Sequence, residues 1–330
     1  MNYLEVQMLI EFHFDQDFLA SDDISGEHAA SLNNFLITFW QLQGCFFYSH
    51  KLRSDYEEWI RYLDAKFSKK WTTAFATFRH SDLNVNNEKV LEIKNTSAFC
   101  DRFRNLDLVI VPNKTTYLGL DAYNKAANIN GTELVWSQEI FNCQCYTLSR
   151  KYMEQGIEAG ADINIVWANN FKKLAKHTKR ITIIDRYMLN NMHEDYSTRR
   201  NALKVFLDFL CKENKKYFVT IYSDGHEKNS DLHEFIANYI RANKNSPFLS
   251  QPLSGIRVCS CPDAIFAQYS HDRFICMDDT VLELGKGFDL FRPKPIFAST
   301  LSYKSRYGSR FESALTKLSS NIVWKEEYVY

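Results

Sequence analysis

Short apolar runs of strand length alternate with segments of helical periodicity in the second half of the chain. Residues 181–184 and 218–222 each form such a run, and apolar residues between them recur at the i, i+3, i+4 spacing of a helix. Strands separated by helices predict βαβ units and a largely parallel sheet. Polar residues that follow such strands lie at the carboxyl edge of the sheet, where α/β proteins bind ligands. The predicted fold class is therefore α/β.

The same pattern continues on both sides of these two strands. Helices are predicted over four segments and strands over three more: 151–159, 171–177, 203–210 and 232–240 as helices, and 256–260, 274–277 and 281–284 as strands. Asp185 and Arg186 follow the first strand and Asp224 follows the second. Their side chains are expected in the binding crevice, where they can orient catalytic groups or receive a phosphate.

The first half predicts a separate α/β or α+β domain over residues 1–145, followed by a second domain over 146–330. Its predicted elements are a strand at 9–14, a helix whose apolar residues run from 32 to 40 and which Gly44 can end, a second helix over 54–67 with Ser54 and Asp55 as caps, a turn at 84–87, and strands at 106–111 and 133–136. The role of this domain stays open between sensing, docking onto a protein partner and restraining the second domain.

Composition says little about the partner. The 330 residues contain 40 Lys plus Arg and 40 Asp plus Glu, so no net charge points to a nucleic acid or a membrane, although a local basic groove remains compatible with this total. The first residues lack the basic region of a signal peptide, and no run of about 20 apolar residues predicts a membrane helix. The spacing of the eight cysteines fits reduced thiols. We expect a cytoplasmic protein without membrane contact.

The most chemically informative segment contains His271, Arg273, Asp278 and Gly285. Two residues separated by one position on a strand point to the same face, so His271 and Arg273 are expected to share a pocket. An imidazole can attack phosphorus while a guanidinium holds the anionic oxygens. Asp278 can orient the imidazole, and the turn formed by Gly285, Lys286 and Gly287 can offer amides and an ammonium group to a phosphate.

This spacing resembles the motif of the phospholipase D superfamily, in which four residues separate the motif Lys from Asp and six separate Asp from Gly. The likeness covers roughly residues 150–295, as a compact single-motif domain. It implies a metal-independent phosphodiesterase, most simply a nuclease acting on DNA or RNA, that needs no cofactor. It also implies a homodimer, because the family joins two motif histidines, one forming a phosphohistidine and the other acting as general acid. Compact domains of this kind occur in bacterial antiphage systems, so a defence role is expected by resemblance.

The motif departs from the family pattern in two respects. Arg273 stands in place of Lys, and Lys286 and Phe288 stand in place of the family's Ser and Asn. Some members of the superfamily, such as the domain that follows microtubule-interacting-and-transport domains, are binding modules. A phosphate-binding or protein-binding module therefore remains an alternative to an enzyme, and a salt-bridged strand end that closes a core is a third interpretation.

Three other patterns carry alternative hypotheses. Cys143 with Cys145 and Cys259 with Cys261 are candidates for a four-thiolate zinc site, although buried thiols packed in a sheet explain them as well. The segment 303–310 interleaves basic and aromatic residues, as in single-strand binding surfaces or in a solvated loop. Acids near predicted strand ends are loosely similar to those of PIN-like nucleases and predict a Mg²⁺ site in the first domain, with surface acids as the other explanation: Glu11, Asp15, Asp17, Asp107, Asp121 and Glu139.

Overall fold

The computed structural model describes residues 8–26, 29–83, 90–93, 95–113, 131–198, 200–270 and 273–330. Its contacts divide the chain into two compact units, Met1–Tyr152 and Met153–Tyr330. The division falls inside helix α8 (Gln144–Glu154), whereas the sequence places the boundary between residues 145 and 146. Ser149 of this helix donates its hydroxyl to the carbonyl of Met8 at 2.5 Å, which attaches α8 to the first unit.

The first unit is built on a five-stranded sheet in the order β3-β2-β1-β4-β5, with every pair parallel. The strands are β1 (Ile10–Phe14), β2 (Gly44–Tyr48), β3 (His80–Asp82), β4 (Leu108–Val111) and β5 (Glu133–Trp136). The chain moves outward in one direction through β2 and β3 and in the other through β4 and β5. The carboxyl ends of β1 and β4 therefore flank the position at which α/β sheets open a binding crevice.

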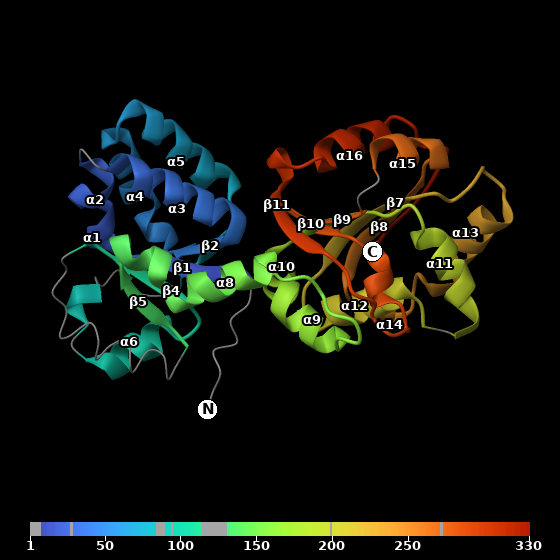
Figure 1. Ribbon diagram of the computed structural model, residues 1–330, viewed down its shortest axis with the longest axis horizontal. Helices are drawn as coiled ribbons and strands as arrows, with labels where there is room; N and C mark the ends of the chain where they lie inside the picture. The colour runs from blue at the N-terminus through green and yellow to red at the C-terminus, as the bar shows by residue number, and fades with distance from the viewer. Residues whose placement is uncertain are drawn as a thin grey trace. The chain divides into compact units, whose positions relative to one another are not determined.

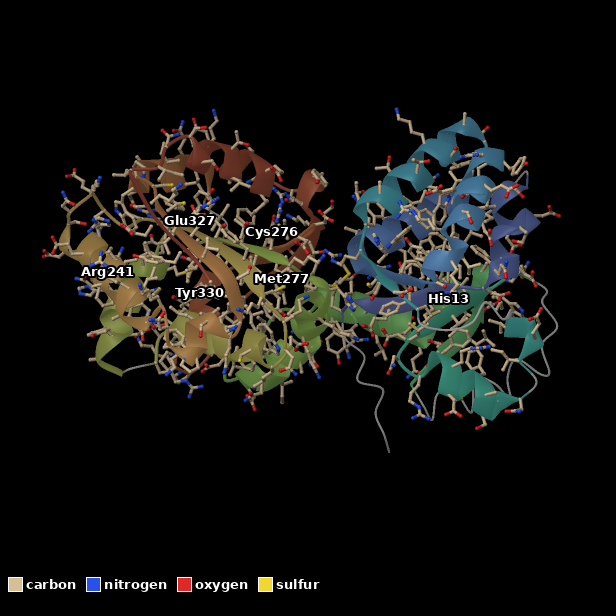
Figure 2. All side chains as sticks on the ribbon, turned by 180° about the vertical axis from the view of Figure 1, so that it is seen from behind. His13, Arg241, Cys276, Met277, Glu327 and Tyr330 are labelled. Atoms are coloured by element: carbon tan, nitrogen blue, oxygen red, sulfur yellow. The ribbon has the colours of Figure 1, made fainter. Side chains whose placement is uncertain are left out.

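Helices cover both faces of this sheet (Figure 1). Phe12, Phe14 and Phe46 point toward α3, α4 and α5 and contact Trp40 and Trp71 through their rings. His13, labelled in Figure 2, points to the opposite face and stacks on Phe103 of α6. The helices of this unit before α8 are α1 (Gln16–Leu19), α2 (Asp22–Ser25), α3 (Ala29–Gln43), α4 (Arg53–Tyr62), α5 (Ala65–Thr77) and α6 (Thr96–Phe103).

The second unit contains a seven-stranded sheet in the order β11-β10-β9-β6-β7-β8-β12. Its strands are β6 (Arg180–Ile184), β7 (Tyr217–Ser223), β8 (Leu253–Ser260), β9 (Arg273–Met277), β10 (Thr280–Leu284), β11 (Leu301–Ser305) and β12 (Trp324–Val329). β6, β7 and β8 are parallel, and the other four strands are added antiparallel. The α/β class is confirmed, but the prediction of a largely parallel sheet is wrong for this unit, because β9, β10, β11 and β12 pair antiparallel with their neighbours. Among the described strands of this unit, only β9 and β10 are joined by a tight turn, Asp278–Asp279.

Helices lie on both faces of this sheet as well (Figure 1). α15 (Asp263–Tyr269) and α16 (Phe311–Ser319) pack with Cys276 of β9, whereas Met277, the next residue along the strand in Figure 2, points to the other face. That face lies toward α9, α10 and α12. The remaining helices are α9 (Ile163–Asn170), α10 (Lys172–His177), α11 (Met188–Glu194), α12 (Ala202–Cys211), α13 (Asp231–Asn243) and α14 (Pro247–Ser250).

Several predicted elements differ from the structure. The helix predicted over 151–159 ends at Glu154, with Gly156 close behind it, and begins earlier at Gln144. The predicted helix over 54–67 is divided into α4 and α5, because the Asp64 side chain accepts the N–H of Lys66 and starts a new helix. α4 itself starts at Arg53, so Ser54 and Asp55 lie inside it. The turn predicted at 84–87 lies outside the described residues. No helix among the described residues combines the length and apolar character that crossing a bilayer requires.

Candidate functional site

The edge of the second sheet where β6 ends and β9 begins carries several polar side chains, and we refer to it as the crevice, after the place where α/β sheets bind ligands. β9 runs antiparallel to β6, and Ile184 pairs with Phe274. Asp185, which follows β6, and Arg273, which opens β9, therefore lie next to each other at the same edge of the sheet. The turn that contains Gly287 contacts both side chains. The structure thus brings together three parts of the predicted site: the polar end of the first strand, the motif arginine and the glycine turn.

Asp185 is buried, and its carboxylate is occupied by backbone amides. Oδ1 accepts the N–H of Tyr187 at 2.9 Å, and Oδ2 accepts the N–H of Phe288 at 2.6 Å. Burial raises the pKa of this carboxyl to about 6, although the two amides and the nearby Arg273 favour its charged form. Of the two roles predicted for Asp185, orienting its neighbours agrees with this geometry. Receiving a phosphate does not, because an ionised carboxylate is only an acceptor and has no proton to donate to the phosphate oxygens.

The glycine turn is packed too closely to accept a side chain at Gly287. This residue has φ +61°, and a Cβ placed there would overlap the side chains of Arg273 and Asp185. Gly285 accepts Nη1 of Arg273 at 2.7 Å through its carbonyl. The amides of Gly285 and Lys286 donate to Thr300 and Ser299, so they are not available to a phosphate as predicted. The exposed Lys286 side chain is still available to an anion at this turn.

Two guanidinium groups converge on one aromatic ring in the crevice. The central carbon of Arg186 lies 5.1 Å from the ring centre of Tyr187, and that of Arg273 lies 5.4 Å from the same centre. Tyr187 is 43% exposed, so its ring forms part of the solvent-facing surface. Arg186 also pairs with Asp263 in the first turn of α15. Tyr187 was not among the residues predicted from the sequence. The feature that could have indicated it is its position, as an aromatic residue directly after the polar residues at the end of β6.

Asp278 lies at the opposite end of β9 from Arg273. Its amide donates to the carbonyl of Arg180, at the start of β6. Its carboxylate accepts the amides of Lys179 at 2.9 Å and Arg180 at 3.0 Å, and its φ is +50°. The structure therefore does not bring Asp278 to the crevice. Strand β9 separates it from the arginine that shares its motif, and its observed contacts hold the β9–β10 turn.

Of the last two predicted members of the site, Asp224 lies within the described residues and His271 does not. Asp224 follows β7 as expected, with Oδ1 accepting the amide of His226 at 3.0 Å and its own amide donating to the carbonyl of Arg186. It lies at the carboxyl edge of the second sheet, and its amide stabilises the loop that carries Arg186. His271 lies outside the described residues, two positions before Arg273 in the chain.

A second polar edge occurs in the first unit, at the carboxyl end of β1. Asp15 follows this strand and is 1% exposed. Its Oδ1 accepts the amide of Val90 at 2.9 Å, while its Oδ2 is buried without a hydrogen-bond partner. Burial raises the pKa of this carboxyl to about 6, and the negative charge of Asp17 adds to the shift. An unsatisfied carboxylate oxygen at this position of a parallel sheet is a candidate metal ligand.

Asp23 connects the carboxyl ends of β4 and β5 and was not among the residues predicted from the sequence. Its Oδ2 accepts the amide of Asn113, after β4, and the hydroxyl of Ser137, after β5, each at 2.6 Å. Asp23 and Asn113 line a cleft of about 660 Å³. Asp23 belongs to an Asp-Asp pair at the start of a short helix, which is the only signal for it in the sequence.

The other predicted acids do not all reach this edge. Asp107 precedes β4 and accepts the amide of Glu11 at 2.7 Å, so it lies at the amino edge of the sheet, away from Asp15. Glu11 is buried within β1, and Glu139 is exposed after β5. Asp121 lies outside the described residues. Converging carboxylates are therefore limited, among the described candidates, to the surroundings of Asp15 and Asp17.

The structure also locates the two remaining patterns. Cys143 and Cys145 belong to the first unit and Cys259 and Cys261 to the second, with all four side chains buried. In the segment 303–310, Tyr307 is 71% exposed, but Lys304 pairs with Glu283 and Arg306 with Glu312. This segment begins within β11 and continues beyond its end, at the edge where Asp278 lies, because Ser305 pairs with Thr280. Its cations are partly neutralised and lie away from the crevice.

Comparison with protein-family models and with curated proteins finds no match for this chain.

Proposed function

We propose that the second unit binds a phosphodiester in the crevice between β6 and β9 and hydrolyses it without a metal ion. The observation that carries this proposal is the convergence of Arg186 and Arg273 on the exposed ring of Tyr187. Two guanidinium groups beside one exposed ring offer charge and hydrogen-bond donors to a phosphate and a stacking surface to a base. A nucleic acid is the substrate class that presents both.

The chemical step in this proposal belongs to His271. Its imidazole attacks phosphorus, the bond to the leaving oxygen breaks, and a second His271 donates the proton that the leaving oxygen takes. Water then attacks phosphorus and gives a proton to the second His271, the phosphorus–nitrogen bond breaks, and both imidazoles return to their starting states. Arg273 and Lys286 hold the phosphate oxygens, while Asp185 and Gly287 position the arginine. The second His271 comes from a second copy of the chain, so the proposal includes a homodimer.

A role in bacterial defence against phage, in the cytoplasm, extends the same proposal. In that setting the first unit senses a signal, docks onto a protein partner or restrains the nuclease. The support is the division of the chain into two compact units.

The test is cleavage of fluorescent single-stranded DNA, duplex DNA and RNA by the full chain in EDTA. Wild type is expected to cleave at least one of them, and His271→Ala and Arg273→Ala to lose cleavage. Arg273→Lys, which restores the family residue, is expected to keep it. His226→Ala, in the same unit, is the matched control and is expected to remain active. Binding of the oligonucleotide without cleavage by any variant favours the non-catalytic module instead.

A second candidate function is supported by the unpartnered Oδ2 of Asp15. In this alternative, Asp15 and the neighbouring Asp17 bind Mg²⁺ at the carboxyl edge of the first sheet and the first unit cleaves a phosphodiester. The two candidates respond oppositely to the same reagents. Cleavage that requires Mg²⁺, survives His271→Ala and is lost in Asp15→Asn would assign the activity to the first unit.

A further inference from the structure

Three side chains of types that bind metal ions meet at the amino edge of the first sheet, the edge opposite to the one where Asp15 lies. Glu133 opens β5, Cys143 precedes α8, and Cys145 is the second residue of that helix. One ligand atom from each lies within 4.8 Å of the other two. No other group of three such side chains as close as this occurs in the part of the chain that the structure describes.

The two sulfur atoms already have the separation that a shared metal ion requires. Sγ of Cys143 and Sγ of Cys145 are 3.5 Å apart, and both side chains are buried. Tetrahedral zinc with Zn–S bonds of about 2.3 Å places two thiolate sulfurs roughly 3.7 Å apart. The thiols therefore need little rearrangement to bind one ion.

The carboxylate is held in position by the start of the helix. Glu133 accepts the amide of Gln144 at 2.8 Å through Oε1 and that of Cys145 at 2.9 Å through Oε2. Each oxygen has a second lone pair for a cation. These bonds hold the Glu133 carboxylate beside the thiols, so it is already oriented before an ion binds.

The surroundings of the thiols are negative, which favours a cation over a free thiolate. The hydrogen bond with Cys143 and burial raise the pKa of Cys145 well above its usual value, and the charges of Glu133 and Asp107 add to this shift. A divalent ion is favoured here because its charge is balanced by two thiolates and by the neighbouring acids Glu133 and Asp107.

We propose that Glu133, Cys143 and Cys145 bind one thiophilic divalent cation of the Zn²⁺ type. Two thiol protons leave as two sulfur–metal bonds form, one oxygen of Glu133 is the third ligand, and water occupies the fourth position. The ion joins the first residue of β5 to the first turn of α8 and so stabilises the end of the first unit. This inference does not depend on either proposed phosphodiesterase.

The test uses the full chain, reduced and freed of metal, titrated with Co²⁺ and then with Zn²⁺. Wild type is expected to bind one Co²⁺ per chain with a sulfur-to-cobalt charge-transfer band that Zn²⁺ abolishes. Cys143→Ser/Cys145→Ser is expected to lose the band, with at least about a 100-fold loss of affinity, and Glu133→Gln to weaken binding on the order of 10-fold or more. Cys259→Ser/Cys261→Ser is the matched control, because it changes a buried Cys-x-Cys pair of the second unit, and it is expected to bind as wild type does.

X-ray absorption of the zinc-loaded wild type decides the question even where the double variant does not fold. Two sulfur ligands with oxygen neighbours support the proposed site. The inference is overturned by a zinc ion with no sulfur ligand, by loss of binding in the Cys259→Ser/Cys261→Ser control alone, or by a wild type that forms a Cys143–Cys145 disulfide and binds neither ion.

Discussion

The Oδ2 atom of Asp185 accepts the amide of Phe288 at 2.6 Å, which joins the end of β6 to the turn after β10 across 103 positions of the chain. The same carboxylate accepts the amide of Tyr187, whose ring contacts Arg186 and Arg273. One buried acid therefore fixes both the turn and the aromatic ring of the crevice.

Gly287→Ala is expected to destabilise the second unit by about 2–5 kcal/mol. A left-handed conformation costs an alanine about 1–2 kcal/mol, and the new Cβ overlaps Arg273 and Asp185, a form of overpacking that costs about 1–3 kcal/mol more. Gly160→Ala is the matched control, because φ is +76° there and no atom lies within 4 Å of the added Cβ. Urea unfolding of both variants measures the difference. Equal losses at the two positions would mean that the turn adapts to a side chain.

Asp278→Ala is expected to lower stability by about 1–3 kcal/mol and to leave the activity of each folded molecule unchanged. The variant loses the acceptor of two backbone amides at the β9–β10 turn, and alanine tolerates φ +50° less well than aspartate. Asp278→Asn keeps part of both contributions and is expected to lie between the two. Urea unfolding and single-turnover rates measure the two effects separately. A lower single-turnover rate in a variant that is fully folded would mean that Asp278 takes part in the reaction.

The stability of the first unit is expected to fall as the pH rises from about 4 to about 6. The pKa of Asp15 is raised from 3.8 to about 6 in the folded state, so the folded chain binds more protons than the unfolded chain over this interval, and stability present at low pH is lost as the carboxyl ionises. The change amounts to roughly 3 kcal/mol.

Asp15→Asn is expected to remove this slope and to be more stable than wild type above pH 6. Urea unfolding at pH 4.5, 5.5 and 7.5 measures it, with Asp55→Asn, an exposed position on α4, as the control. Mg²⁺ is expected to stabilise wild type at pH 7.5 and not Asp15→Asn, because an ion that binds only the folded state adds to its stability. If the free energy of unfolding of the wild type does not change across this interval, Asp15 does not have the raised pKa in the folded state.

Tyr187→Ala is expected to weaken binding of a single-stranded oligonucleotide by about 10-fold, since removal of the ring releases two guanidinium groups and a stacking surface worth about 1–2 kcal/mol. Tyr187→Phe keeps the ring and is expected to bind nearly as wild type does. Tyr196, 59% exposed in the same unit and in contact with Phe235, provides the control substitution Tyr196→Ala. Fluorescence anisotropy measures all four proteins. Unchanged affinity in Tyr187→Ala would move the binding surface away from this ring.

Strands β6 to β10 of the second unit could be located from sequence because each is a short apolar run with polar residues at its end. The predicted runs 181–184 and 274–277 each lie within one residue of the bounds of β6 and β9. Periodicity carries no information on strand direction, however, so the antiparallel placement of β9 beside β6 could not be predicted. That placement is what brings Arg273 to Asp185 and carries Asp278 to the other end of the strand.

The missed elements have physical reasons of their own. β2 follows α3 without a turn, and Gly44 packs directly against the ring of Phe12 instead of ending a helix in a loop. β12 has the sequence WKEEYV, whose charged residues interrupt the apolar pattern that predicts a strand. An edge strand such as β12 tolerates these charges because one of its two sides has no partner strand. The sulfur separation of Cys143 and Cys145 depends on the start of α8, which the sequence placed at residue 151.

The pairing of β12 with β8 has a consequence for synthesis on the ribosome. Ser260 ends β8 and pairs with Trp324, so the outer edge of β8 has no partner strand until residues 324–329 have emerged. During that interval the nascent sheet presents an unpaired apolar strand to other chains. Stop codons or ribosome stalling just before Trp324 should therefore yield aggregates rather than a shortened but soluble second unit.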